Sequence, residues 1–396
     1  MKLILKLLAG IAAGTLVGLF APDWITRILL TFKDLFGQLL FFTIPLLILF
    51  FITAGIAGLP RNSGKLLGRT LGTAYASTIL AGILAFLVAS LVIPLLSPEA
   101  SNAAAAAVDG AEPLSPYLEL EIPPLLGIMT ALATAFVFGL GIAATGSTQL
   151  KGLFDEGRDV IAKLLVAVII PLLPFYIAGI FAELAAAGTV FDTLRTFGVV
   201  LLLALSLHWT WIVTLFVIAG IVAGISPLRA IRNMLPAYFT ALGTMSSAAT
   251  IPVTLQSARN NGVREEVASF SVPLCATTHL AGSTMTIVAC AVAVMVMHDA
   301  LAMPTLVSML PFIFMLGIVM LAAPGVPGGA VMAAVGLLGS MLGFGETAIA
   351  LMIALYMAQD SFGTACNVTG DGAIAVMVDQ AGARDVDARS GVRGSA

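Results

Sequence analysis

Charged residues are scarce in this sequence. Asp, Glu, Lys and Arg together account for 10% of its 396 residues, while 60% are hydrophobic. An ordinary soluble domain carries about 25% charged residues, and the charges available here could not cover a water-exposed surface. The formal net charge is −3, and there is no basic stripe of the kind that binding to nucleic acid requires. The composition therefore excludes an ordinary soluble protein and predicts no nucleic-acid partner.

Cysteine and histidine are also rare, with three of each. Cys275, Cys290 and Cys366 lie in apolar surroundings, so we expect small packing residues and no disulfide framework. A Cys/His spacing typical of a metal site is absent. Gly-x-Ser-x-Gly and His-Glu-x-x-His, two motifs of hydrolases, are absent as well. We therefore expect a protein that is not an enzyme.

Long apolar runs are abundant. Spanning about 30 Å of hydrocarbon takes roughly 20 apolar residues in a helix, and only helices and closed barrels satisfy every backbone group in lipid. We predict an all-α polytopic membrane protein with eight transmembrane helices, embedded in a lipid bilayer. The first run has no small-residue cleavage site before Pro22, so we expect a retained helix. Seven runs precede the last helix: 3–21, 35–58, 70–96, 122–144, 160–182, 196–225 and 267–298.

The distribution of Lys and Arg predicts the orientation in the membrane. If the amino terminus is cytoplasmic and the spans alternate, 15 basic residues lie inside and only Arg27, Lys33 and Arg195 lie outside. Cytoplasmic loops are the ones that carry excess Lys and Arg. We therefore expect a multi-pass protein of the cell (inner) membrane with both termini in the cytoplasm.

Two segments do not fit ordinary spans. Between Arg232 and Arg259 lie 26 uncharged residues with a Ser/Thr-rich centre at 243–252, and both basic flanks should stay cytoplasmic. Residues 300–345 contain no charged residue, are bounded by acids and are broken by Pro and Gly at 324–329. We predict two re-entrant helical hairpins that enter from opposite faces, with a pair of Pro-kinked ordinary spans as the alternative.

Each predicted hairpin is followed by one long helix, at 263–298 and at 346–380. Hairpin and helix thus occur twice with opposite orientation, which is an inverted repeat. In transporters, such repeats place the binding site near the middle of the membrane, where broken helices meet.

The last predicted helix carries polar residues on one face. Asp360, Thr364, Asn367 and Asp371 follow the spacing i, i+4, i+7 and i+11. Two carboxylates inside a membrane segment cost at least a few kcal/mol each unless they meet cations or donors. Asp360 can neutralise an ammonium group, while Asp371 and the Asn367 amide oxygen offer hard oxygen ligands to an alkali cation. The alternative is that both acids sit at helix ends in water.

An enzyme and a channel are the alternative function classes. An intramembrane aspartyl protease would need Asp360 and Asp371 to share one water, yet 11 residues of helix separate them by about 16 Å. A passive channel would need no closed site for a carboxylate, and its flux would show neither saturation nor cation dependence. Both classes fit the residues less well than a transporter.

Three motifs together resemble the dicarboxylate/amino acid:cation symporters, the glutamate-transporter homologues. They are Met-Ser-Ser-Ala-Ala-Thr-Ile-Pro-Val-Thr from 245, Pro-Gly-Val-Pro-Gly from 324 and Asn-Val-Thr-Gly-Asp from 367. The resemblance is specific over about 236–380. It implies an elevator-type homotrimer in which spans 1 to 6 (1–230) form mainly the scaffold, 231–381 form the transport core and 382–396 form a cytoplasmic tail. Spans 3 and 6 belong partly to the transport domain.

The resemblance also implies roles for single residues. Asp360 corresponds to the residue that binds the substrate amino group, and Thr364 and Asn367 to residues that hold its polar groups. The carboxylate of the substrate would be held at the two hairpin tips, by Ser246, Ser247, Val326 and Gly328. Sodium would be bound by Asn367 and Asp371, and at a second site by main-chain carbonyls near Cys275, Thr277, Leu280 and 320–323.

Two departures from the family pattern concern the substrate. Members that carry acidic substrates have an Arg where this chain has Gly363, and some relatives carry one where it has Met245. A second substrate carboxylate would be desolvated without a cation, at a cost of several kcal/mol. The Gln-Asp-Ser-x-x-Thr-Ala-x-Asn motif also resembles the bacterial serine/threonine branch. We therefore predict a neutral amino acid such as alanine, serine or threonine, or a somewhat larger one, with an acidic amino acid as the alternative.

Other departures concern the coupling ion. The family has an Asp where this chain has Ala281, and Ile79 replaces an expected hydroxyl ligand, so fewer sodium sites are expected. His279 stands where an Asn would bind sodium beside Asp371. It is either a protonated substitute for a sodium ion, which would couple transport to protons, or a neutral hydrogen-bonding residue, which we prefer. His208 is expected at the membrane interface among aromatic residues.

Overall fold

The computed structural model describes residues 2–58, 64–96, 114–118, 120–298, 301–321, 323 and 327–393. Within these ranges the chain is helical and contains no strand. Six helical segments are long and apolar enough to cross a membrane, which confirms an integral membrane protein: Asp23–Ala57, Lys65–Leu96, Thr148–Ala186, Val190–Ala223, Glu265–Met297 and Glu346–Gly382. Shorter apolar helices occur at Leu5–Phe20, Thr130–Thr145, Leu306–Met320 and Gly329–Leu342.

The first half of the chain forms long helices, two of which contain a short π-helical stretch. In chain order the elements are α1 (Lys2–Phe20), α2 (Asp23–Leu47), η1 (Ile48–Ile52), α3 (Thr53–Ala57), α4 (Gly64–Leu96), α6 (Ile128–Thr145), α7 (Thr148–Leu164), η2 (Leu165–Ile169), α8 (Ile170–Ala186) and α9 (Val190–Ala223).

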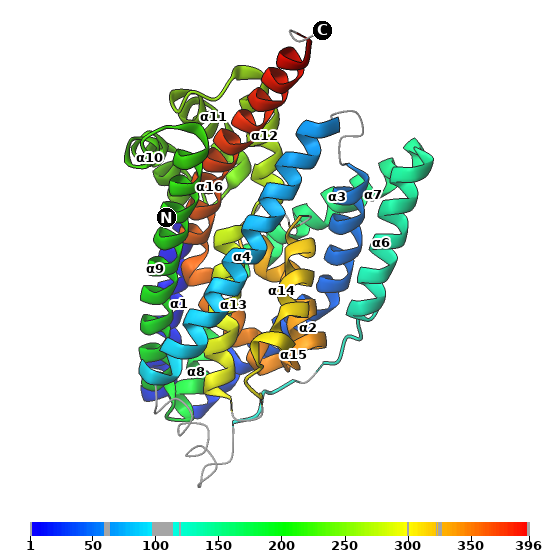
Figure 1. Cartoon of the computed structure of the whole chain (residues 1–396). Coiled ribbons are helices and arrows are strands. Elements are labelled where there is room, and N and C mark those ends of the chain that lie inside the picture. Colours follow the sequence, from blue (N-terminus) through cyan, green and yellow to red (C-terminus); the bar gives the residue numbers. More distant parts are fainter. Residues whose placement is uncertain are drawn as a thin grey trace.

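The second half alternates short and long helices. Its elements are α10 (Pro227–Thr244), α11 (Ser247–Asn260), α12 (Glu265–Thr278), α13 (Ala281–Met297), α14 (Leu306–Met320), α15 (Gly329–Leu342) and α16 (Glu346–Arg393). In Figure 1, α10, α11 and α12 gather at the end of the molecule from which α16 projects, whereas α15 lies toward the other end. With 48 residues, α16 is about 72 Å long, more than twice the thickness of a hydrocarbon core.

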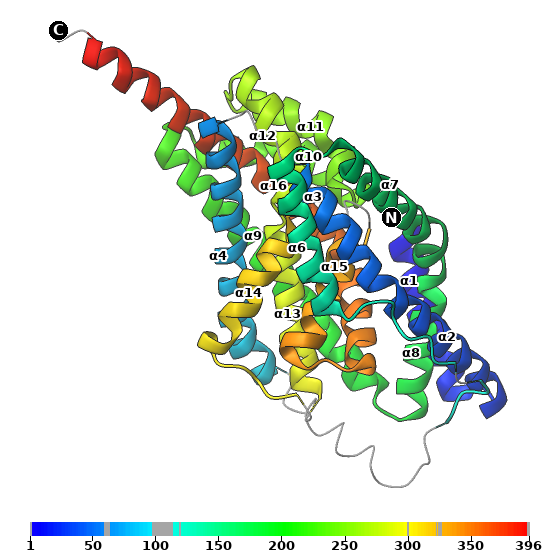
Figure 2. The same cartoon turned by 90° about the vertical axis from the view of Figure 1, so that its right-hand side faces the viewer.

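The helices form two groups. α8 packs against α1 and α2, and these three lie on one side of the molecule in Figure 2. In the other group α13 packs against α4 and α16, and α16 also packs against α9 and α10. Contacts between the groups are fewer and join α15 to α2, α16 to α1 and α8, and α9 to α8. The polar face of α16 is therefore enclosed within the second group.

Small residues let α1 approach α8 closely. Gly10, Gly14 and Gly18 follow each other at every fourth position, and a Cβ atom at these sites would lie 2.4, 2.1 and 2.3 Å from carbonyl oxygens of α8. Such spacing of small residues is common where membrane helices pack backbone to backbone. The close crossing of these two helices thus depends on the absence of a side chain at these three positions of α1.

The prediction of one continuous helix over 263–298 is wrong. Helix α12 ends at Thr278 and α13 begins at Ala281, while His279 and Leu280 have non-helical backbone angles. Leu280, at the N-cap position of α13, offers no side-chain cap to that helix. The cap comes from α16, because the Asn367 Oδ1 atom accepts hydrogen bonds from the Gly282 and Ser283 N–H groups. The first N–H groups of a helix have no partner within the helix. The Asn367 side chain supplies one here, which allows the helix to break inside the protein.

Candidate functional site

A small cavity lies where four segments of the second half converge. Its volume is about 20 Å³, which exceeds the roughly 10–15 Å³ needed for one water and is too small for an amino acid. The walls come from the turn between α10 and α11, the break between α12 and α13, the region between the end of α14 and the start of α15, and the middle of α16. The lining residues are Met245, Ser247, Ala276, Leu280, Ser283, Ala323, Ala330, Tyr356, Asp360, Thr364 and Asn367.

Asp360 is the charged residue of this cavity, and both its oxygens accept hydrogen bonds. Oδ1 accepts from the Tyr356 hydroxyl at 2.8 Å, and Oδ2 accepts from the Gly328 N–H at 2.7 Å. Gly328 precedes α15 and has a left-handed φ of 75°, a conformation that glycine adopts without strain. The carboxylate is therefore fixed in position, and each oxygen keeps a further lone pair for a cationic ligand.

Asn367 joins α16 to the start of α13. Its Oδ1 accepts from the Gly282 N–H at 2.8 Å and the Ser283 N–H at 3.3 Å, and its Nδ2 donates to the Ser283 Oγ at 2.9 Å. A side-chain oxygen that accepts from the first N–H groups of a helix is an N-cap, here supplied by another helix. Thr364, one turn before, donates to the Asp360 carbonyl at 2.9 Å.

The turn between α10 and α11 presents Met245, Ser246 and Ser247. Met245 has a φ of 54°, the left-handed region that non-glycine residues rarely adopt. Ser246 caps α11 by accepting from the Ala249 N–H at 3.3 Å. Ser247 lines the cavity, whereas Ser246 is not part of its wall. The positive end of α11 thus faces the site through its first residue.

Asp371 lies one turn beyond Asn367 and pairs with His279. The His279 Nδ1 lies 2.8 Å from the Asp371 Oδ1, and its Nε2 lies 2.9 Å from the Ser77 Oγ on α4. The Trp211 Nε1–H on α9 donates to the same Ser77 oxygen at 3.2 Å. Both members of the pair are almost completely buried. A neutral imidazole that donates from Nδ1 and accepts from Ser77 satisfies both ring nitrogens and the Ser77 hydroxyl.

One carboxylate oxygen of Asp371 is suited to bind an alkali cation. The Asp371 Oδ2 is buried and has no hydrogen-bond partner, and a buried carboxylate oxygen without a partner is costly unless a cation is near. Among the described residues no group of three or more His, Cys, Asp and Glu could hold a metal ion. A hard cation here would therefore take carbonyl and amide oxygens beside Asp371.

The structure brings most of the predicted site residues together. Ser247, Leu280, Asp360, Thr364 and Asn367 line one cavity, and Gly328 is bonded to Asp360. The remaining predicted residues are placed as follows: the Cys275 carbonyl accepts from the His279 N–H at 2.8 Å, Thr277 is exposed, and Val326 and residue 322 lie outside the described residues.

Gly363 does not line the cavity. A Cβ atom at this position would point at α13, with the Ser283 N and the Thr286 Oγ1 each at 3.4 Å. A side chain at position 363 would therefore meet α13 first.

The prediction that His208 lies at the membrane interface is wrong. The residue is 2% exposed, and its Nε2 lies 3.1 Å from the Gly282 carbonyl oxygen and 3.0 Å from the Thr286 Oγ1. The sequence holds a signal for this, because His208 shares one helical face of α9 with residues that are all buried. These residues are Val200, Ala204, Trp211, Leu215 and Ala219.

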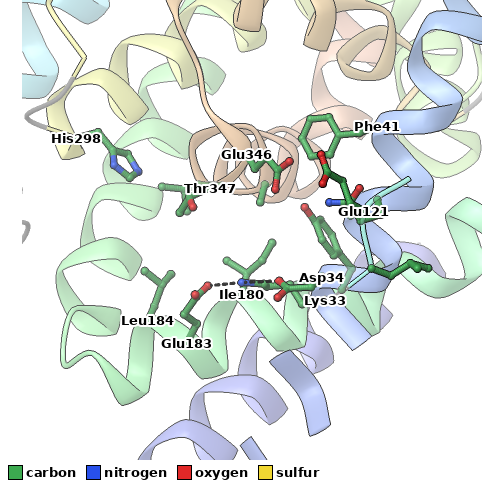
Figure 3. A pocket seen from close by; sticks show the side chains of 16 residues that line it. Lys33, Asp34, Phe41, Glu121, Ile180, Glu183, Leu184, His298, Glu346 and Thr347 are labelled. Carbon is green, nitrogen blue, oxygen red and sulfur yellow. Dashed lines mark hydrogen bonds and ion pairs between the residues drawn. The ribbon is translucent and has the colours of Figure 1, made fainter. Parts of the chain in front are cut away.

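A larger cavity, of about 590 Å³, lies between the two helix groups and shares no residue with the first. Figure 3 shows side chains from α2, α8 and the start of α16 around it. Lys33 is held there by Glu183 at 2.9 Å and Asp34 at 3.1 Å. Glu121 and Glu346 add two further acids to the lining. A substrate carboxylate would meet an excess of negative charge there. The smaller cavity is therefore the candidate substrate site, and its walls must move apart before it can hold an amino acid.

Comparison with known proteins finds a matching family model and several similar transporters. A model of the sodium:dicarboxylate symporter family matches residues 3–381. The serine/threonine transporter SstT of Streptococcus suis is 31% identical over 299 residues, which cover 72% of this chain and 81% of that protein. SstT of Acinetobacter baylyi is 30% identical over 281 residues, which cover 67% of this chain and 66% of that protein.

A vertebrate relative matches a shorter part. Human excitatory amino acid transporter 1 is 31% identical over 162 residues, which cover 40% of this chain and 29% of that protein. The match thus spans less than a third of this relative's length.

Proposed function

This chain belongs to the sodium:dicarboxylate symporter family, and on that premise we propose that it moves a neutral amino acid across the cell membrane as a secondary active symporter coupled to sodium. The family consists of transporters, so the chain is not assigned a catalytic role. The expected substrates are alanine, serine, threonine or somewhat larger neutral amino acids. The names of the SstT relatives, serine/threonine transporters, favour the same class.

One observation carries this proposal. Among the residues described as lining the small cavity, Asp360 alone is charged. Its carboxylate can pair with the α-ammonium group of an amino acid. A second carboxylate on the substrate would find no cation in the lining, and a buried charge without a partner is strongly disfavoured. A neutral side chain carries no such cost, and Ala276, Ala323 and Ala330 leave it an apolar wall.

We place the α-carboxylate of the substrate at the starts of α11 and α15. Helices α11 and α15 begin at Ser247 and Gly329, beside the cavity, and the N-terminus of a helix attracts an anion. We assign Ser246, Ser247, Val326 and Gly328 to this carboxylate. Thr364 and Asn367 face the polar groups of the substrate from α16.

Sodium is the proposed coupling ion. Asp371 would bind it through the unpartnered Oδ2 together with Asn367, and carbonyl groups near Cys275, Thr277 and Leu280 would form a second site. When bound, sodium supplies positive charge next to buried carboxylates. Fewer sodium sites are proposed than in relatives with acidic substrates, because Ala281 offers no ligand. A proton at His279 is the alternative ion, although the neutral arrangement of this residue favours sodium.

An elevator movement is the proposed mechanism. Helices α11, α14 and α15 contain 14, 15 and 14 residues, about 21 to 23 Å each, and are too short to cross about 30 Å of hydrocarbon. This supports the proposed arrangement of two re-entrant hairpins in addition to eight transmembrane helices. The sparse contacts between the helix groups support movement of 231–381 with parts of spans 3 and 6 against the rest of 1–230. A homotrimer with cytoplasmic termini remains part of the proposal.

Transport by purified protein in liposomes tests this function. An inward sodium gradient should drive saturable accumulation of labelled serine, alanine or threonine, and dissipating the gradient should abolish it. Protein-free liposomes are the control. Accumulation of aspartate or glutamate in preference to these substrates would contradict the neutral assignment, and flux without saturation would indicate a channel.

The choice between sodium and proton has its own test. The variant His279→Asn removes the titratable ring and can still donate to Asp371. With sodium coupling, the dependence of uptake on pH should be the same in wild type and variant. If the variant loses a pH dependence that the wild type shows, the proton alternative is the correct one.

A further inference from the structure

We infer that His208 is a positioning residue that holds the Asn367 amide in place through the backbone at Gly282 and Ser283. His208 lies on α9, outside the lining of the cavity, and no motif singles it out. The inference concerns how the proposed site is built, so its consequence for transport rests on the proposed function.

The first step is the proton on the imidazole ring. The Gly282 carbonyl oxygen lies 3.1 Å from the His208 Nε2 and can only accept a hydrogen bond. The Thr286 Oγ1, 3.0 Å from the same nitrogen, gives its own hydrogen to the Gly282 carbonyl and can also only accept here. The Nε2 atom therefore carries a hydrogen that these two oxygens share. The Nδ1 atom is buried without a partner, so it carries none and the ring is neutral. With the hydrogen on Nδ1, two acceptors would face each other across the Nε2 contact.

The second step is the geometry of one peptide unit. The Gly282 C=O and the Ser283 N–H belong to the same planar trans peptide and point in opposite directions. His208 donates to the carbonyl oxygen, while the N–H donates to the Asn367 Oδ1 at 3.3 Å. His208 and Asn367 thus hold one peptide from its two sides. Hydrogen bonds in such a chain polarise and strengthen one another.

The third step is that the backbone at Gly282 must be held in place by other residues. A Cβ atom at position 282 would lie 2.5 Å from the Gly363 carbonyl oxygen and 2.6 Å from the Cys366 Cβ. Glycine is therefore required, and its backbone is the least restricted of any residue. The residue also lies next to the break at 279–280. His208 and Thr286, which donates to the same oxygen at 3.0 Å, limit its movement.

Two variants test this role. His208→Gln can place an amide N–H near the position of Nε2, whereas His208→Leu has a similar size and no donor. For His208→Leu we expect the half-saturating concentrations of serine and of sodium to rise about 5- to 30-fold, as for a lost buried hydrogen bond. The maximal rate per folded protein should stay within about twofold. His208→Gln should restore both concentrations to within about threefold of wild type.

Any result in which the two variants behave alike contradicts the inference, whether both are normal or both are equally impaired. A second measurement does not depend on transport. The protein has three histidines, so nitrogen NMR of histidine-labelled protein can identify the His208 signals as those lost in His208→Gln. A neutral ring with hydrogen on Nε2 is expected, and hydrogen on Nδ1 would overturn the inference. If the wild type transports no amino acid while this NMR result holds, the proposed function fails and the structural role stands.

Discussion

The carboxylate of Asp360 is held from two sides, by Tyr356 on its own helix and by the Gly328 N–H. For the variant Asp360→Asn we expect uptake at low substrate concentration to fall at least 100-fold. Removing one partner of a buried ion pair costs about 3–5 kcal/mol, which corresponds to a factor of roughly 10² to 4 × 10³. The measurement is the initial rate of sodium-driven serine uptake.

The matched control is Asp379→Asn, the same substitution on the same helix. Asp379 pairs with Arg264 at 2.7 Å and does not line the cavity. Uptake by this variant should stay within a few-fold of wild type. Similar losses in both variants would mean that Asp360 acts on the fold and not on the substrate.

Gly282 and Gly363 face each other across the contact between α13 and α16 but differ in the room around them. A Cβ atom meets a backbone oxygen at 2.5 Å at position 282, whereas at position 363 the nearest atoms lie at 3.4 Å. Gly282→Ala should destabilise the protein by about 1–3 kcal/mol through overpacking. Gly363→Ala should have a much smaller effect. Thermal unfolding in detergent measures both, and equal melting temperatures would contradict the packing argument.

At the scale of helices, replacing Gly with Ala is expected to have opposite effects in α1, which packs closely on α8, and in α4. Gly14→Ala places a methyl group 2.1 Å from the Ala178 carbonyl oxygen, so the helices must separate and the protein should lose about 1–3 kcal/mol. Gly72 in α4 has no atom within 4 Å of its Cβ position. Gly72→Ala should therefore stabilise α4 by up to about 1 kcal/mol. Unfolding in detergent that shifts in the same direction for both variants would contradict this account.

The sequence predicted a helix and its polar face where residues of one kind recur at helical spacing. The spacing of Asp360, Thr364, Asn367 and Asp371 gave one face of α16, and this face does carry the cavity and the cap of α13. The break at His279–Leu280 could not be predicted in this way, because no Pro marks it and its cap comes from residue 367. Burial of His208 was missed because its own neighbours include aromatic residues typical of an interface, although the period of α9 contained the signal.

At the scale of the whole molecule, the cavity of about 590 Å³ between the two helix groups should change shape if one group moves against the other. Thr347 lines it from the start of α16. In the variant Thr347→Cys, a bulky maleimide should remove most of the uptake. The native Cys275, Cys290 and Cys366 are buried and free, so they should react little.

The control for this labelling is Thr148→Cys, at the exposed start of α7. Its labelled form should transport as fast as its unlabelled form. If labelled Thr347→Cys also transports at the unlabelled rate, the cavity does not take part in the movement.

The length of α16 has one more consequence. Asp360 and the final turns at Arg393 belong to a single unbroken helix, and a helix about 72 Å long must leave the membrane. Such a rod carries any shift or tilt of the site outward to its free end, which Figure 1 shows projecting from the molecule. If the site moves as proposed, a fluorophore attached to that end would report the movement from the aqueous side.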